Sequence, residues 1–102
     1  MVRIREVAIT TRKEYRYDLP HLIKKGDIKE LGNRDFHAKG FQGKSKNKVL
    51  SSIAKAAETL ESNLVIIERE RSTKRGVYKA NVTFYRDSVD LKKMPEDYMF
   101  HV

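Results

Sequence analysis

The tripeptide Gly43-Lys44-Ser45 is the part of the chain that comes nearest to a known chemical motif. It matches the end of a phosphate-binding loop and stands where a helix is expected to begin. The complete loop needs an earlier glycine, and Ala38 occupies that position. No buried strand is expected before it, so we expect no nucleotide hydrolysis. The free N–H groups of such a loop–helix junction still suit a DNA phosphate.

The other residue types that support catalysis or metal binding are not suitably spaced. The histidines His21, His37 and His101 lack the spacing of a metal site. The absence of cysteine excludes disulfides and thiolate ligands. No nucleophile, base and orienting acid can be argued from spacing. We expect no catalytic activity, no cofactor and no metal.

The composition indicates a polyanionic partner. The 102 residues, interpreted as one domain over 1–102, contain 22 Lys and Arg against 14 Asp and Glu, a formal charge of +8. The excess is concentrated in separate blocks, which favours a localised binding surface. No apolar run is as long as a membrane span, so we expect a cytoplasmic protein without a membrane partner.

One basic block lies between two segments that are rich in β-branched and aromatic residues, Leu64–Ile67 and Val77–Tyr85. They predict an antiparallel hairpin, with Gly76 left-handed at the end of its turn. A hairpin tip is narrow enough to enter a DNA groove or follow a row of phosphates. The candidate DNA-binding residues on this hairpin are Arg69, Arg71, Ser72, Thr73, Lys74, Arg75 and Lys79.

The alternation of apolar residues predicts a register for this hairpin, with Ser72–Arg75 as its loop. The pairs expected on the apolar face are Ile67 with Ala80, Val65 with Val82, and Asn63 with Phe84. On the other face Glu68 is expected opposite Lys79, which would neutralise the stem. The cations then left without an acidic partner, and expected to enter or straddle the minor groove, are Arg71, Lys74 and Arg75.

A second basic block surrounds the start of the segment Ser45–Glu61. Its apolar residues recur at the helical period, so it predicts the longest helix of the chain, with Ser45 as N-cap. Lysines at this junction, with Asn47 among them, are suited to the DNA backbone. A solvated helix start is the competing interpretation. The candidate contacts are Lys44, Lys46 and Lys48, with Lys39 nearby.

The segments before this helix predict smaller elements. Val2–Thr10 has the composition of a strand with one buried face. Asp18 is expected to cap a short helix that ends at Gly26. Asp27 is expected to cap a second short helix, which Gly32 ends.

Two further segments are expected to be irregular or docked. Arg34–Lys44 contains glycines and predicts a loop, with Phe36 and Phe41 as its buried anchors. The apolar tail Asp97–Val102 and the residues around Met94 are candidates for a dimer contact, because an apolar terminus is normally docked.

The order of short helices, a longer helix and a hairpin with a basic tip resembles a winged helix-turn-helix domain over residues 18–86. In that family Ser45–Glu61 would be the longer helix and Arg71–Gly76 the wing. The fold class expected is therefore α+β and winged helix-turn-helix-like, with an added N-terminal strand. Arg34–Lys44 departs from the pattern, because it is long for the turn that precedes a recognition helix.

The chain also resembles the TcpK family of relaxosome accessory proteins of clostridial conjugative plasmids. The resemblance lies in the length, the strand Val2–Thr10, the helix Ser45–Glu61 and the basic tip Arg71–Gly76. It implies a homodimer that binds duplex DNA near a plasmid transfer origin, largely through the wing, beside other relaxosome proteins. Paired or repeated half-sites would follow from two-fold symmetry.

Two alternatives to a sequence-preferring duplex DNA-binding protein stay open. A binder of RNA or single strands would present Tyr78, Phe84 and Tyr85 on a sheet face for stacking. The expected register counts against it, because that register buries Phe84. A basic protein-interaction module would instead target an acidic protein.

Overall fold

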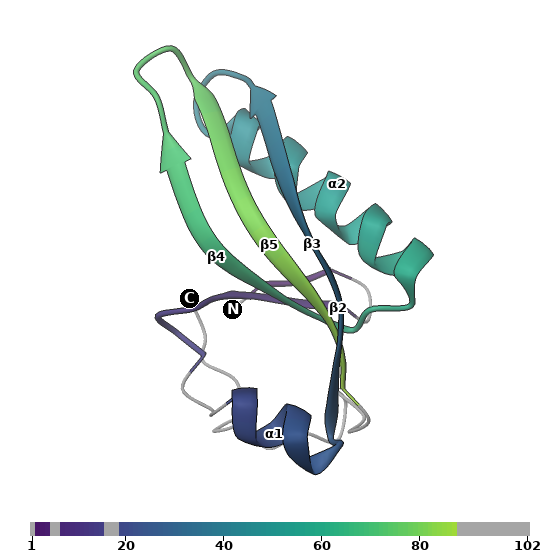
Figure 1. The fold of residues 1–102 in the computed structure, drawn as a ribbon. Coiled ribbons are helices and arrows are strands. Elements are labelled where there is room, and N and C mark those ends of the chain that lie inside the picture. Colours follow the sequence, from purple (N-terminus) through teal and green to yellow (C-terminus); the bar gives the residue numbers. More distant parts are fainter. Residues whose placement is uncertain (1, 5–6, 16–18, 88–102) are drawn as a thin grey trace.

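The computed structural model describes residues 2–4, 7–15 and 19–87. Its strands form one five-stranded mixed sheet in the order β1-β2-β4-β5-β3. The long strands β4, β5 and β3 lie side by side in Figure 1. In chain order the elements are β1 (Val2–Ile4), β2 (Val7–Thr11), α1 (Leu19–Lys25), β3 (Ile28–Lys39), α2 (Lys44–Leu60), β4 (Leu64–Ser72) and β5 (Val77–Asp87).

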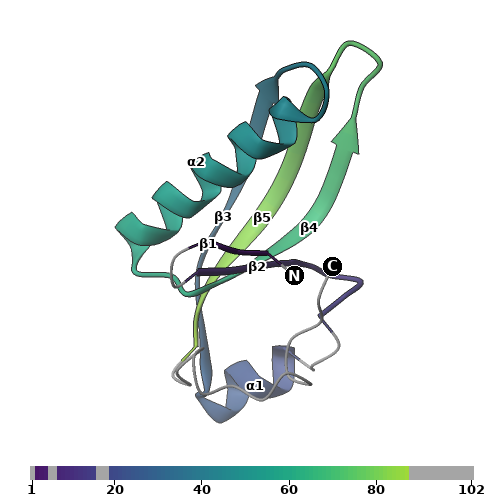
Figure 2. The same ribbon diagram turned by 180° about the vertical axis from the view of Figure 1, so that it is seen from behind.

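Strand β5 occupies a central place and is antiparallel to both β4 and β3. Strands β3 and β4 therefore run in the same direction, with helix α2 connecting them and β5 inserted between them. At the other side of β4, strand β2 adds a parallel pairing and β1 pairs antiparallel with β2 (Figure 2). The β3–β5 and β2–β4 pairings thus join segments that are far apart in the sequence.

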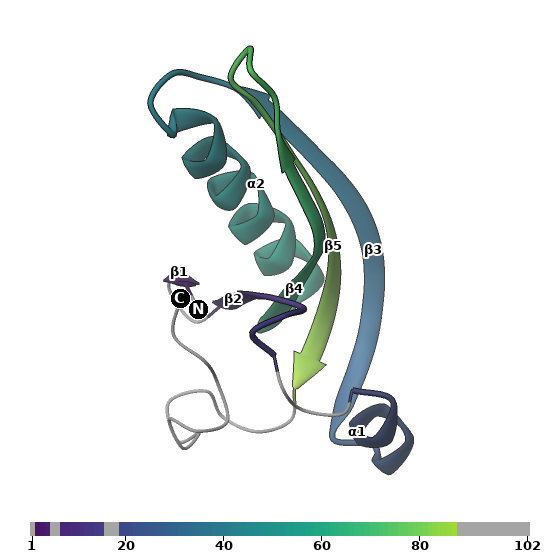
Figure 3. The same ribbon diagram turned by 90° about the vertical axis from the view of Figure 1, so that its left-hand side faces the viewer.

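Helix α2 covers one face of the sheet (Figure 3). It buries Val49, Ile53 and Ala57, which recur at helical spacing. The strands contribute alternate residues to the same core, as a period of two requires. The strand residues buried in this cluster are Val7, Ile9, Val65, Ile67, Tyr78, Ala80, Val82 and Phe84.

The opposite face of the sheet is covered at one end only. There helix α1 packs beside β3, and Leu19 joins a second buried cluster with Tyr15 and Ile28. Towards the β4–β5 turn, the residues on this face are exposed or half-buried, among them Asp35, His37, Arg69, Arg71, Lys79 and Asn81.

The expected winged helix-turn-helix arrangement is wrong, although the α+β class is right. The second short helix after Asp27 and most of the loop Arg34–Lys44 are the single strand β3. From Asn33 onward, polar residues that face outward alternate with residues that face α2. Pairing with β5 over this whole length outweighs the local preference for short helices and turns. The β4–β5 hairpin is therefore the centre of a sheet and not a projecting wing.

The smaller expectations have mixed outcomes. The long helix is confirmed as Lys44–Leu60, and Gly26 follows α1 with a left-handed φ of 91°. Ser45 is not the N-cap, because Gly43 takes that place and Ser45 lies buried inside the helix. Val2–Thr10 contains two strands that pair with each other. Asp18, Met94 and the tail Asp97–Val102 lie outside the described residues.

The hairpin is confirmed, but its register differs from the expected one. Ile67 pairs with Val82, and a bulge after Ile67 inserts one extra residue, so Arg69 pairs with Asn81. The N–H of Thr73 donates to the carbonyl of Val77 over 2.8 Å. This bond closes a turn that is tighter than the expected loop Ser72–Arg75. Up to Ile67 the pairing differs from the expected one by two residues, which keeps every side chain on its face, and beyond the bulge β4 is polar, so apolar alternation could not distinguish the two registers. The other expected pairings, Val65 with Val82, Asn63 with Phe84 and Glu68 with Lys79, are wrong for the same reason.

The turn and the loop after β3 give a testable stability prediction. Gly76 and Gly43 have φ angles of 79° and 80°. A Cβ at Gly76 would stand 2.5 Å from the carbonyl oxygen of Gly40, whereas a Cβ at Gly43 would meet nothing within 4 Å. Each alanine variant should lose about 1–2 kcal/mol for the left-handed backbone. Gly76→Ala should lose measurably more in urea unfolding, and equal losses would contradict the close packing of these two loops.

Candidate nucleic-acid interface

The two basic blocks of the sequence meet at one end of the molecule. The N–H of Gly40 donates to the carbonyl of Gly76 over 3.1 Å, which joins the β3–α2 loop to the β4–β5 turn. The short distance from a Cβ at Gly76 to Gly40 shows how closely these loops pack. We call this region the basic end, and its cations are Lys39, Lys44, Lys46, Lys48, Arg71, Lys74, Arg75 and Lys79.

These cations are exposed, and little at this end neutralises them. No carboxylate occurs from His37 to Ala57 or from Arg71 to Arg86. The nearby Glu70 accepts a hydrogen bond from the hydroxyl of Tyr78. Among the ion pairs of the described residues, none involves a cation of the basic end.

Several contacts hold the helix start beside the sheet. The Nζ of Lys48 donates to the carbonyl of Lys39 over 3.0 Å. The Nζ of Lys46 lies 5.9 Å from the ring centroid of Tyr78. The first turn of α2 has no acidic residue and no side-chain cap. Because a helix N-terminus already carries partial positive charge, lysines there are unfavourable unless an anion is bound.

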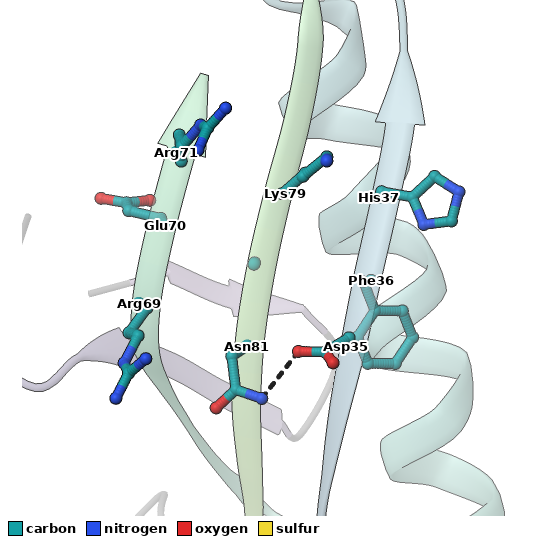
Figure 4. Close-up of a pocket in the computed structure, with 9 residues that line it drawn as sticks. Asp35, Phe36, His37, Arg69, Glu70, Arg71, Lys79 and Asn81 are labelled. Atoms are coloured by element: carbon teal, nitrogen blue, oxygen red, sulfur yellow. Dashed lines mark hydrogen bonds between the residues drawn. The ribbon is translucent and has the colours of Figure 1, made fainter. Parts of the chain in front are cut away.

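A row of two cations and a histidine crosses the uncovered sheet face next to the basic end. Arg71 on β4 lies directly opposite Lys79 on β5, which lies opposite His37 on β3. Figure 4 shows the three side chains at one level of the sheet. Like charges directly opposite each other destabilise a strand pair. The charges of Arg71 and Lys79 therefore do not stabilise the isolated fold.

A second row on the same face is polar and of mixed charge. Arg69, Asn81 and Asp35 lie side by side on β4, β5 and β3, and Asn81 donates to Asp35 over 2.7 Å (Figure 4). The two rows line an open depression of ≈ 400 Å³. Asn33 and Asn81 also exchange amide hydrogen bonds of 3.0 and 2.9 Å. Amides and guanidinium groups in such rows are suited to base edges as well as to phosphates.

Glu68, the extra residue at the bulge, forms hydrogen bonds with side chains of neighbouring segments. It accepts from Arg12 Nε over 2.8 Å and from the hydroxyl of Thr83 over 3.0 Å. The hydrogen bond to Glu68 raises the pKa of Arg12 above its ordinary value. Glu68 therefore does not neutralise Lys79, contrary to the expected register, and Lys79 faces Arg71 instead.

The remaining candidate residues are divided between exposed and structural positions. Lys74, Arg75 and Ser72 are exposed at the turn. Thr73 is half-buried, and its hydroxyl accepts from the N–H of Val77, so it shapes the turn. Sequence reasoning missed the contribution of His37, Asn81 and Asn33. The alternation of polar residues along 33–39 was the signal that could have placed them.

The aromatic residues proposed for base stacking on the sheet are buried. Phe84, Tyr78 and Tyr85 expose 1%, 3% and 4% of their surface. Burial is the main cause that raises the pKa of Tyr78, and the hydrogen bond to Glu70 adds to it. The hydroxyl therefore stays protonated and donates a hydrogen bond to Glu70. Burial likewise raises the pKa of Tyr85. The stacking mode of the alternative single-strand reading is therefore wrong for these residues.

Comparisons of the chain with protein-family models, curated proteins and solved structures give no match. Neither described helix has the length and apolar character needed to cross a membrane. Within residues 2–4, 7–15 and 19–87, no three His, Asp or Glu side chains gather as metal ligands would. The site is defined by its charge and shape alone.

Proposed function

We propose that this protein binds duplex DNA without catalysing a reaction, through the basic end and the adjoining row on the sheet. The observation that carries the proposal is the row Arg71, Lys79 and His37. In this row the like charges of Arg71 and Lys79 lie directly opposite each other and join the cations of the turn. Phosphates would relieve this repulsion and release counterions from the DNA.

The shape supports a duplex over other polyanions. Lys39, the last residue of β3, pairs with Val77, so only the turn at residues 73–76 extends beyond the three strands, and a narrow tip of this kind can enter a DNA groove. The amide and guanidinium groups of the second row are suited to base edges, which would give the binding a sequence preference. RNA binding by stacking on the sheet would need aromatic residues that are buried here.

The direct test is a fluorescence-anisotropy titration with duplex DNA, single-stranded DNA and RNA of the same length at several salt concentrations. The proposal expects the tightest binding to the duplex and a linear fall of log affinity with log salt. Equal affinity for all three ligands would leave only nonspecific electrostatic binding. Preference for an acidic protein over the duplex would favour an interaction module.

The biological setting is also part of the proposal. The resemblance to relaxosome accessory proteins places the target near a plasmid transfer origin, in the cytoplasm, and implies a homodimer with relaxosome partners. It now rests on the helix and the hairpin, because the winged-helix arrangement is absent. Sedimentation with and without DNA, and footprinting on transfer-origin DNA, test these points. Random protection along that DNA would contradict them.

A further inference from the structure

Phe41 is the most exposed large apolar side chain among the described residues. It exposes 83% of its surface, whereas Leu60 and Ile23 expose 42% and 39%. The sequence predicted Phe41 to be a buried anchor of its loop, and that prediction is wrong. Leaving a phenylalanine in water forgoes about 1.5–3 kcal/mol of burial, so the ring contributes little to folding in this position.

The backbone beneath this ring is held in place. Gly40, its neighbour, donates to Gly76, and the carbonyl of Phe41 accepts from the N–H of Lys44 over 3.0 Å. The next residue, Gln42, has a left-handed φ of 53°, which is unusual for a residue with a side chain. The loop therefore presents the ring from a fixed and partly strained base.

Cations surround the ring in the sequence and in the fold. Lys39 and Lys44 lie within three residues of Phe41, and the contact between Gly40 and Gly76 brings the turn with Lys74 and Arg75 alongside. An aromatic ring set among exposed cations is suited to a partner that offers flat aromatic faces next to phosphates. Nucleic-acid bases have both features.

A lipid surface fits this arrangement less well. Membrane binding grows with the apolar area that is inserted. The other exposed apolar residues of the described chain, Ile23 and Leu60, lie on α1 and at the end of α2, away from the loop (Figure 1). One ring in isolation matches the space between two base pairs.

We propose that Phe41 inserts between base pairs of the bound duplex and bends it, while the surrounding lysines and arginines hold the flanking phosphates. Apolar side chains used in this way unstack one base step and kink the duplex. This inference rests on the proposed duplex binding and extends it, because it assigns the contact that is not electrostatic. It also predicts a preference for easily unstacked pyrimidine–purine steps.

The experiment uses tryptophan as a reporter, since the chain contains none. In Phe41→Trp, stacking on bases should quench most of the tryptophan fluorescence at saturating duplex. Leu60→Trp, at the far end of α2, is the matched control and should be little affected. Phe41→Ala should weaken duplex binding about tenfold and reduce bending, measured by energy transfer between end labels, with the salt slope unchanged.

The outcomes separate this inference from the proposed function. Suppose that the protein binds duplex in a salt-dependent way, but Phe41→Trp is not quenched and Phe41→Ala bends the duplex as much as the unmodified protein. This result would overturn the role of Phe41 and leave the proposed function standing. Loss of all salt-dependent duplex binding in the unmodified protein would overturn both. A blue shift of Phe41→Trp with phosphatidylserine vesicles, and no change with duplex, would assign the ring to a membrane and overturn the inference.

Discussion

The double variant Arg71→Thr/Lys79→Thr is expected to bind duplex DNA on the order of 10- to 100-fold more weakly than the unmodified protein. Each lost phosphate contact should also lower the slope of log affinity against log salt by about 0.9, so the pair should lower it by about 2. Threonine keeps the preference for a strand, which limits the effect on folding. Anisotropy titrations at several salt concentrations measure both quantities.

A matched control lies at the other end of β5, where it pairs with β3. Lys29 on β3 pairs with Arg86 on β5, and Arg86 donates to the carbonyl of Glu61. Lys29→Thr/Arg86→Thr removes the same two charges far from the basic end, so duplex affinity should change much less. If both double variants weaken binding equally, net charge alone would explain the affinity. The first variant should also unfold at an unchanged or higher urea concentration, because it removes a repulsive pair.

Ile53→Ala is expected to destabilise the fold by about 2–5 kcal/mol, the usual cost of a cavity in a core. Ile53 is fully buried in the middle of α2, where the helix meets the sheet. For a domain of this size that is a large share of a total stability of about 5–15 kcal/mol. Urea unfolding followed by circular dichroism measures it.

Leu60→Ala, at the half-exposed end of the same helix, provides the comparison. It should cost about 0.5 kcal/mol or less, as surface substitutions usually do. A loss at Leu60 as large as that at Ile53 would mean that α2 is not seated on the sheet as described. It would also indicate that the exposed end of the helix has a partner.

The elements that the sequence predicts well are those with local signals. The apolar period of α2 and the β-branched residues of the hairpin identify both without knowledge of their neighbours. In strand β3 the alternation over residues 33–39 is the one local signal, and it is weaker than the glycine and polar residues that are typical of short helices and a loop. Only its pairing with β5, which follows α2 and β4 in the chain, makes Asn33 and His37 strand residues.

The candidate site shows the same division. Its cations were identified from the sequence, but their neighbours were not. The extra residue at Glu68 and the tight turn decide that Lys79 faces Arg71, and neither leaves a trace in apolar alternation. Phe41 was misjudged because an aromatic residue in a glycine-containing loop is usually an anchor for that loop.

The central place of β5 has a consequence for how the protein is made. Of the described strands β5 is synthesised last, yet it supplies the ladder for both β3 and β4. Until it leaves the ribosome, β3 has no strand to pair with, and the apolar face of α2 lacks much of its cover. Pairing between such distant segments forms slowly, so the nascent chain exposes apolar strand residues until β5 has paired. We expect the charged side chains of β3 and the cations around the turn to limit association of these intermediates, a role in folding that needs no bound partner.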